Sequence, residues 1–308
     1  MNWLVIVNKK AGQGSAGKLW NFTEVSLKAA GINFTARFTE APAQTRLLAS
    51  NALNLGYDGV IVFGGDGTAS DAAASLSPLE CRPVLAFLPA GSGNDWIRSV
   101  GFNPATIDSC IKAIAAGNTG LVDAGICIWQ GGSRFFLNSA GAGFDALVLK
   151  RTIGARKFLP FGKMNYLFVL AVSAFLPPHW RAAISCDGKP FYKGDYLTLT
   201  TGVGRYSGGG MLLSPSAVSD DGLLDCAVLA PMNFFTIAKH AAKLFDGTLL
   251  ETKWATSARG KVIRIEPDRP GSLVIELDGE IVIPGKDSSY IELVSLPDNL
   301  RVIVPPEE

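Results

Sequence analysis

The first part of the chain alternates between two patterns of residues. Short apolar runs predict buried strands, and longer stretches rich in helix-forming residues predict helices. The predicted strands are residues 4–7, 33–38, 59–63 and 84–88, and the predicted helices are residues 16–30, 43–55, 68–76 and 108–116. Alternation at this spacing is typical of a parallel sheet covered by helices.

The pattern changes after about residue 122. Short strands separated by Gly, Asp and Pro turns now predict a mostly antiparallel, β-sandwich-like domain. The predicted strands are residues 126–129, 134–139, 182–186, 196–202, 224–229, 262–266, 273–277 and 290–294, interrupted by helical patterns at 166–175 and 233–245. We therefore expect an α/β domain with a parallel sheet over residues 1–122 and a β-rich domain over residues 123–299.

Composition narrows the class of protein. A length of 308 residues suits two domains. With 48% hydrophobic and 18% charged residues the chain has the composition of a globular protein, and a net charge of +1 gives no reason to expect nucleic-acid binding. The five cysteines are scattered without a Cys-x-x-Cys pair, which favours reduced thiols and argues against a zinc site.

Residues 1–3 lead directly into the first predicted strand, so no signal peptide is expected. The longest apolar stretch, residues 166–176, is too short to cross a bilayer. We expect a soluble, cytoplasmic protein.

Residues 64–68, Gly-Gly-Asp-Gly-Thr, form the most informative motif. They lie between a predicted strand and a predicted helix, and glycines there let backbone N–H groups approach a phosphate closely. The helix that follows would direct its positive N-terminal end at the same anion. Asp66 adds a carboxylate where a phosphate-bound metal ion would lie.

Glycine turns also occur at residues 11–17 and 89–95, again at carboxyl ends of predicted strands, where α/β sheets bind ligands. Residues 12–17 also match a dinucleotide fingerprint, with Glu40 near the position of a ribose-binding acid. With Lys18 they match most of a Walker A loop, but Leu19 lacks the hydroxyl which that motif needs. Neither alternative accounts for the two later turns, so a Rossmann dehydrogenase is not the preferred interpretation.

Six short motifs follow one another along nearly the whole chain. They are residues 64–68, 89–95 (Pro-Ala-Gly-Ser-Gly-Asn-Asp), 138–145 (Asn-Ser-Ala-Gly-Ala-Gly-Phe-Asp), 208–211, 220–225 and 278–280 (Asp-Gly-Glu). Together they resemble the diacylglycerol kinase catalytic family, which includes bacterial lipid kinases and sphingosine and ceramide kinases. Ser92 stands in place of the family's threonine, and Lys9 replaces a proline in its first phosphate loop. NAD kinases share the run at 64–68, but Asn94-Asp95 replaces their Asn-Glu pair, which favours the lipid branch.

The resemblance implies a kinase that uses ATP and Mg²⁺ to phosphorylate a hydroxyl of diacylglycerol or a related lipid. The two histidines, His179 and His240, lie in no recognisable motif, so the base should be a carboxylate, and the resemblance places it at Glu280. Asp66 is the second catalytic candidate, and Asp66 and Asp95 are candidates for the catalytic magnesium or its waters. The resemblance also implies that a final strand near 300–305 packs on the first domain.

The resemblance also implies binding residues. The expected nucleotide-binding residues are Asn8, Lys9, Lys10, Ala11, Gly12, Thr39, Gly64, Gly65, Asp66, Gly67, Thr68, Ala69, Ser70, Asp71, Gly91, Ser92, Gly93, Asn94 and Asp95. A separate structural magnesium is expected on Val218, Asp221 and Leu223, where a solvated acidic turn is the competing interpretation.

Residues 146–186 contain six Lys and Arg residues, interleaved aromatic residues, and no Asp or Glu. Such a segment suits a peripheral membrane surface over residues 150–181, at the inner face of the membrane, and equally a core helix with a solvated basic face. Two alternative functions stay open: an NAD kinase-like small-molecule kinase and a catalytically silent nucleotide-binding regulator. Assembly as a homodimer also stays open.

Overall fold

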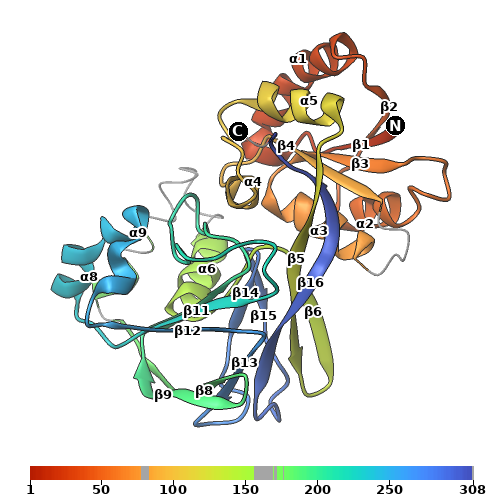
Figure 1. Ribbon diagram of the computed structural model, residues 1–308. Coiled ribbons are helices and arrows are strands. Elements are labelled where there is room, and N and C mark those ends of the chain that lie inside the picture. Colours follow the sequence, from red (N-terminus) through yellow and green to blue (C-terminus); the bar gives the residue numbers. More distant parts are fainter. Residues whose placement is uncertain (78–82, 156–168, 170–171, 176, 307–308) are drawn as a thin grey trace. The chain divides into compact units, whose positions relative to one another are not determined.

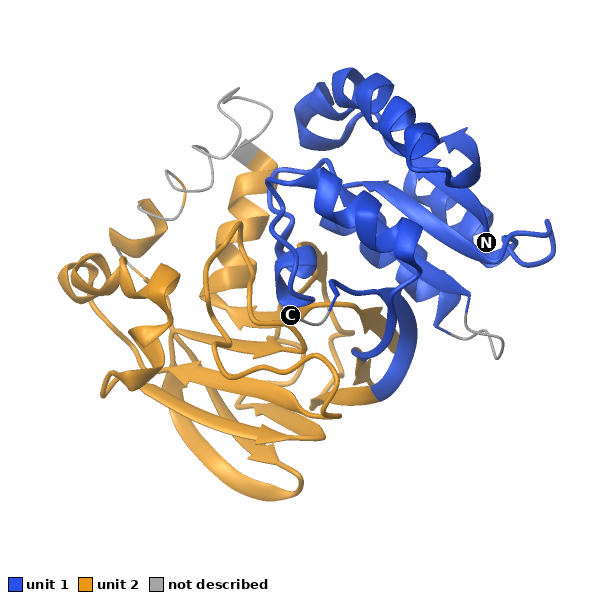
Figure 2. Cartoon of the chain, turned by 45° about the horizontal axis from the view of Figure 1, so that its top comes forward, with its two compact units in different colours: residues 1–124, 297–308 blue, residues 125–296 orange. Residues whose placement is uncertain are grey.

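The structure is a computed structural model that describes residues 1–77, 83–155, 169, 172–175 and 177–306 (Figure 1). The chain divides into two compact units (Figure 2). Unit 1 contains residues 1–124 and 297–308, and unit 2 contains residues 125–296. The chain passes between the units within two long strands, β5 (Thr119–Trp129) and β16 (Ile291–Ile303).

Unit 1 is built on a parallel sheet with the strand order β2-β1-β3-β4. Its strands are β1 (Asn2–Val7), β2 (Asn33–Phe38), β3 (Gly59–Gly64) and β4 (Val84–Pro89). All six residues of β3 and of β4 are buried, as expected for central strands covered on both faces. The carboxyl end of β16 joins this sheet beside β4, where Val302 pairs with Leu85 in parallel.

Helices connect and cover the strands of unit 1. They are η1 (Ala11–Gly14), α1 (Ser15–Ala29), α2 (Pro42–Ser50), α3 (Asp66–Leu76), α4 (Asp95–Ser99) and α5 (Ile107–Ala116). The helix α2 packs on α3, and α1 contacts α5. Trp20 of α1 is buried with its ring centroid 5.2 Å from that of Phe63 in β3, so the helix is held directly against the sheet.

Unit 2 contains an antiparallel sheet with the order β12-β11-β10-β7-β14-β15. Its strands are β7 (Ser139–Gly143), β10 (Thr198–Gly202), β11 (Leu224–Leu229), β12 (Ala255–Gly260), β14 (Ile275–Leu277) and β15 (Glu280–Val282). A second set of strands pairs in the order β16-β13-β8-β9, and β6 (Gly132–Phe136) pairs with β5. The remaining strands are β8 (Trp180–Cys186), β9 (Lys189–Tyr196) and β13 (Val262–Pro267).

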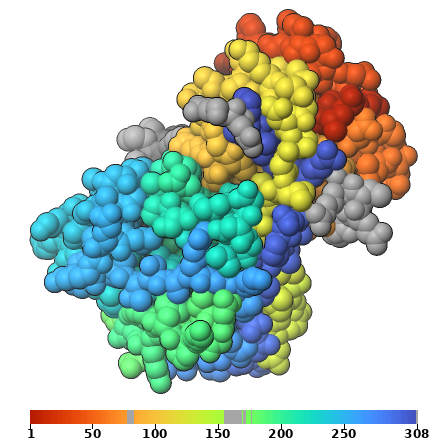
Figure 3. All heavy atoms as spheres, in the orientation of Figure 1, coloured from red at the N-terminus to blue at the C-terminus, as the bar shows by residue number. Residues whose placement is uncertain are grey.

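Side chains from both sets of strands form one core in unit 2. It includes Phe136, Tyr196, Leu199, Val228 and Ile263. The helix α6 (Phe144–Ala155) contacts β7, β10 and β14. The short helices α8 (Phe234–His240), α9 (Lys243–Asp246) and η2 (Thr248–Glu251) follow β11, and the space-filling view shows α8 and α9 at the surface of unit 2 (Figure 3).

The predicted fold class is confirmed: a parallel α/β sheet at the N-terminal side and an antiparallel sheet at the C-terminal side. The single strand predicted at 134–139 is wrong, because β6 ends at Phe136 and β7 begins at Ser139. The predicted helix at 233–245 is two helices, α8 and α9. The helix predicted at 166–175 lies largely outside the described residues.

Cys110, Cys127, Cys186 and Cys226 are free thiols, and Cys81 lies outside the described residues. No helix in the described part of the chain has both the length and the apolar character needed to span a membrane.

Candidate functional site

Three turns follow β1, β3 and β4 at one edge of the parallel sheet. Because these strands are adjacent and parallel, their carboxyl ends lie side by side. The second and third turns are hydrogen-bonded: the Ala90 N–H donates to the Gly64 carbonyl oxygen at 2.7 Å. The prediction that the glycine turns share an edge is therefore confirmed.

The turns touch through backbone atoms where glycine is required. A Cβ on Gly91 would lie 2.5 Å from the Cα of Gly65, a distance that real Cβ atoms essentially never show. A Cβ on Gly12 would lie 2.7 Å from the carbonyl oxygen of Ala90, and Gly12 has a φ of +56°. Since backbone cannot move aside as a side chain can, these glycines allow the three turns to form one surface.

Asn94 fixes the shape of the third turn. Its Oδ1 accepts a hydrogen bond from the Gly91 N–H at 3.0 Å, and its Nδ2 donates to the Gly91 carbonyl at 3.1 Å. Asn94 itself has a φ of +56° and directly precedes α4. Asparagine tolerates this left-handed conformation better than most residues, which explains its place here.

Asp66 joins the second turn to the third. Its carboxylate accepts hydrogen bonds from the backbone N–H groups of Asn94 at 2.6 Å and Trp96 at 3.2 Å. Burial, together with the nearby charge of Asp95, raises the pKa of Asp66, although these N–H bonds act in the opposite direction. Asp66 therefore positions the start of α4, a task that the motif alone did not indicate.

The loop after β1 is tied to the second turn by Asn8. The Asn8 Nδ2 donates to Thr68 Oγ1 at 3.0 Å, and its Oδ1 accepts from the Lys10 N–H at 3.0 Å. The Lys9 ammonium lies 4.1 Å from the ring centroid of Phe38, so the lysine that replaces the family's proline rests on β2.

Thr39 and Asp71 are both buried in unit 1. Thr39 is buried at the end of β2, where its N–H donates to the Val7 carbonyl at 3.0 Å. Asp71, in α3, forms an ion pair with Arg46 of α2, with an Nε–Oδ1 distance of 2.7 Å. Arg46 was not predicted from the sequence, because nothing in the pattern marks which helix packs on α3.

All of the predicted nucleotide-binding residues belong to unit 1, whereas Glu280 and the three predicted metal ligands belong to unit 2. In unit 1 most of these residues lie in the turns after β1, β3 and β4 or in the first turns of α3, whereas Thr39 follows β2. The Thr68 and Ala69 N–H groups donate to the Gly65 carbonyl at 2.9 and 3.1 Å. The N–H groups of Asp66 and Gly67 precede them at the start of α3, outside the i to i−4 ladder of the helix, where they can face an anion. The arrangement can therefore bind a phosphate chain.

In unit 2, Asp278 and Gly279 form the two-residue turn between β14 and β15, with φ values of +48° and +82°. The Asp278 carboxylate accepts hydrogen bonds from the N–H groups of Leu137, Asn138 and Ser139, at 2.6, 2.9 and 3.1 Å. These bonds end the ladder of β6 and explain why the predicted strand at 134–139 is interrupted.

Glu280 begins β15 directly after this turn. Its carboxylate forms an ion pair with Arg134 of β6, and both side chains are partly exposed. Arg134 orients the carboxylate of Glu280. No local pattern indicates this pairing, since the two residues are 146 positions apart.

The predicted metal loop lies before β11. Asp221 Oδ1 accepts from the Leu223 N–H at 3.0 Å, and its other oxygen pairs with Arg259, which also bonds Asp225 at 2.9 Å. Val218 is exposed. Across the described ranges, no three or more His, Cys, Asp and Glu side chains gather at one metal-sized site. The Asp221 carboxylate suits a hard cation, which would share it with the guanidinium of Arg259.

Comparisons with known proteins agree with these features. Residues 2–127 match the family described as "Diacylglycerol kinase catalytic domain", and residues 138–304 match the "YegS C-terminal NAD kinase beta sandwich-like domain". The chain is 32% identical over 264 residues to a Pseudomonas putida protein named "Probable lipid kinase YegS-like", covering 82% of this chain and 81% of that protein. It is 28% identical over 303 residues to a Mycobacterium tuberculosis "Diacylglycerol kinase", covering 97% and 94%.

A solved structure of a diacylglycerol kinase from Bacillus anthracis superposes with a TM-score of 0.73 at 25% identity, covering 99% of this chain and 97% of that one. Sequence and fold thus agree over both units. The chain belongs to the diacylglycerol kinase-like family of lipid kinases.

Proposed function

We propose that this lipid kinase transfers the terminal phosphoryl group of ATP, with Mg²⁺, to a hydroxyl of diacylglycerol or a related lipid. The observation that carries the proposal is the contact of three phosphate-sized turns through Gly12, Gly65 and Gly91. Relatives named diacylglycerol kinase make diacylglycerol the first lipid to test.

The nucleotide phosphates would lie over the N-terminus of α3 and the turns at 8–12 and 91–95. Backbone N–H groups and the positive end of the helix would offset their charge. A bound Mg²⁺ would neutralise further charge on the transferring phosphoryl group. Asp66 and Asp95 supply the carboxylates for the ion or its waters, while Asp66 also holds the third turn in place.

Glu280 is the proposed general base. An ionised carboxylate can accept the proton of the attacking hydroxyl, and the ion pair with Arg134 fixes its orientation before the lipid arrives. The turn residue Asp278 serves this arrangement indirectly, because its three backbone hydrogen bonds fix the hairpin that carries Glu280.

The loop of Val218, Asp221 and Leu223 is the proposed site of a structural Mg²⁺. Asp221 would supply a carboxylate, and the other two residues backbone carbonyls. The proposed location is the cytoplasm, with reversible contact at the inner face of the membrane.

The experiment is a screen with ATP labelled on its terminal phosphate against extracted lipids, with NAD⁺ added as a competing acceptor. We expect label in a Mg²⁺-dependent phospholipid product and none on NAD⁺. Label on NAD⁺ would favour the small-molecule kinase. ATP binding without any transfer would favour the catalytically silent regulator.

A further inference from the structure

A row of residues crosses three neighbouring strands of the antiparallel sheet in unit 2. Thr200 of β10 and Glu276 of β14 are both paired in register with Gly141 of β7. Side chains of directly paired residues project from the same face of a sheet. Thr200 and Glu276 therefore project from one face on either side of Gly141, and the missing side chain leaves a hollow between them.

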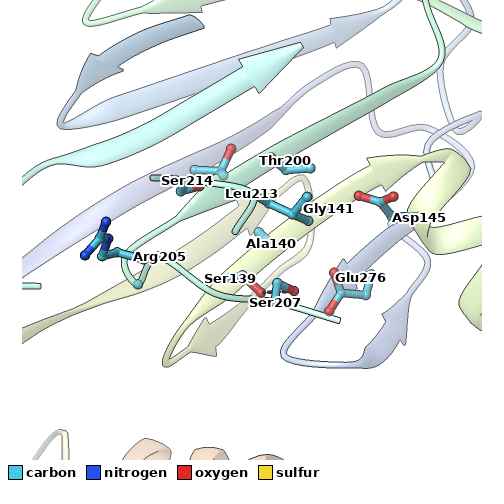
Figure 4. A pocket seen from close by; sticks show the side chains of 12 residues that line it. Ser139, Ala140, Gly141, Asp145, Thr200, Arg205, Ser207, Leu213, Ser214 and Glu276 are labelled. Atoms are coloured by element: carbon cyan, nitrogen blue, oxygen red, sulfur yellow. Dashed lines mark hydrogen bonds between the residues drawn. The ribbon is translucent and has the colours of Figure 1, made fainter. Parts of the chain in front are cut away.

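Asp145 reaches the same hollow from the first turn of α6. A Cβ on Gly141 would lie 3.0 Å from Glu276 Oε2 and 3.4 Å from Asp145 Oδ2. Two carboxylate oxygens thus border the space that a side chain at position 141 would fill. Figure 4 shows both carboxylates at the same end of the pocket, near Gly141.

The two carboxylates have no cationic side chain paired with them within the described ranges. Arg205 also lines the pocket, but its Nε donates to the Pro215 carbonyl at 3.0 Å, and Figure 4 shows it at the opposite end from Asp145. Burial raises the pKa of Asp145 to about 6. Burial, with the charges of Asp145 and Asp278, raises the pKa of Glu276 to about 8, against a lowering hydrogen bond from the Gly279 N–H.

Thr200 provides an independent observation. Its side chain is 9% exposed, and its Oγ1 is buried without a hydrogen-bond partner among the residues that the structure describes. Burying a hydroxyl in this way costs about 1–3 kcal/mol unless a partner is supplied. Thr200 lines the same pocket as the two carboxylates. A ligand that accepts lone pairs from hydroxyl and carboxylate oxygens would satisfy all three groups.

We propose that Asp145, Glu276 and Thr200 bind one hard divalent cation over Gly141. Oxygen ligands and two carboxylates suit Mg²⁺, Ca²⁺ or Mn²⁺. The cavity is about 10 Å³, which is the space of about one water-sized particle.

The bound cation joins β10 and β14, which lie on either side of β7, to α6. It also fixes β14, the strand that leads into the turn before Glu280. The site shares no ligand with the proposed loop of Val218, Asp221 and Leu223, so the two can be tested separately.

The test is a titration of the nucleotide-free, full-length protein with Mn²⁺, in which bound ions are counted by electron paramagnetic resonance. The variants are Glu276→Gln, Asp145→Asn and Gly141→Ala, the last of which fills the hollow and keeps both carboxylates. Each should bind about one Mn²⁺ fewer per chain than the wild type. The control variant Glu251→Gln, at an exposed residue outside both proposed cation sites, should bind as many Mn²⁺ ions as the wild type.

A second measurement uses the wild-type protein, so that the proposal is tested even if a variant fails to fold. Because a proton and a cation compete for the same carboxylate oxygens, the wild-type affinity for Mn²⁺ should rise from about pH 4 to pH 8. Thr200→Val, which preserves side-chain shape, should weaken Mn²⁺ binding about tenfold. Equal Mn²⁺ stoichiometry in wild type and Glu276→Gln, or a wild-type affinity that does not change over this pH range, would overturn the proposal.

Discussion

Asp66 has a structural role in the third turn and a proposed role in catalysis. Its carboxylate accepts hydrogen bonds from the N–H groups of Asn94 and Trp96, so it shapes the third turn, and we propose that it also serves the magnesium ion on the phosphates. Replacing it by alanine would leave two buried donors without their acceptor, and each such donor costs about 1–3 kcal/mol.

We therefore predict two effects of Asp66→Ala. Turnover should become undetectable, and the free energy of unfolding in urea should fall by about 2 kcal/mol or more. Asp66→Asn, which retains one acceptor oxygen, should recover part of the stability and none of the turnover. Near-normal turnover in Asp66→Ala would show that the carboxylate has no part in catalysis.

Glu280 is predicted to act on the acceptor hydroxyl and not on the nucleotide. Glu280→Gln keeps the size of the side chain but cannot accept a proton, so kcat should fall by about 10²–10⁴-fold. The dissociation constant for ATP, measured by calorimetry, should change less than twofold. If the substitution weakens ATP binding while the rate of the chemical step is unaltered, Glu280 is not the base.

At the scale of elements, the contact between the second and third turns makes a separate prediction. Gly91→Ala and Gly65→Val should push the turns apart, because the new side chain would meet backbone. We expect ATP to bind at least ten times more weakly to both. Gly285→Ala is the matched control, since nothing lies within 4 Å of its Cβ position. Unchanged ATP affinity in Gly91→Ala would mean that the nucleotide does not use this surface.

Several elements could be predicted closely from local pattern. The strand at 33–38 was predicted with the bounds that β2 has, and the strand at 224–229 with those of β11. Both strands are short segments that lie between clear turn signals in the sequence. The edge at which the glycine turns meet also followed from local pattern, because parallel strands align their carboxyl ends.

Other elements depend on partners distant in sequence. The edge strand β12 has little apolar alternation and was not predicted, because it exists through pairing with β11. The helix α4 was missed because it is five residues long and is held by Asp66. Likewise, the pairings Arg134–Glu280 and Asp71–Arg46 come from packing, which no local period encodes.

At the scale of the whole molecule, the predicted membrane surface over residues 150–181 is a prediction that aromatic and basic side chains of unit 2 bear on. Phe175 and Phe235 are exposed, and each ring lies 5.7 Å from the ring of Phe234. Lys150 lies exposed on α6, and Arg151 donates to Ser173 Oγ at 2.9 Å. Arg156, Lys157 and Lys163, which belong to the predicted basic surface, lie outside the described residues.

If this basic segment meets a membrane, binding to anionic vesicles should weaken as salt rises. Each cation contributes about 1 kcal/mol, so Lys150→Glu, Arg156→Glu and Lys157→Glu together should weaken vesicle binding about 10²-fold or more. Activity on a short-chain lipid dispersed in detergent should persist in the triple variant. Sedimentation with vesicles measures the binding, and insensitivity to both salt and charge reversal would rule out an electrostatic surface.

The central claim is that the three turns hold ATP for transfer to a lipid hydroxyl. The most direct measurement follows ADP and phosphorylated lipid together, with diacylglycerol as acceptor and Mg²⁺ present. We predict one ADP for each phosphorylated lipid, little ADP without lipid, and neither product from Asp66→Ala. ADP formed at the same rate without lipid, or ATP bound with no product under any acceptor, would contradict the account.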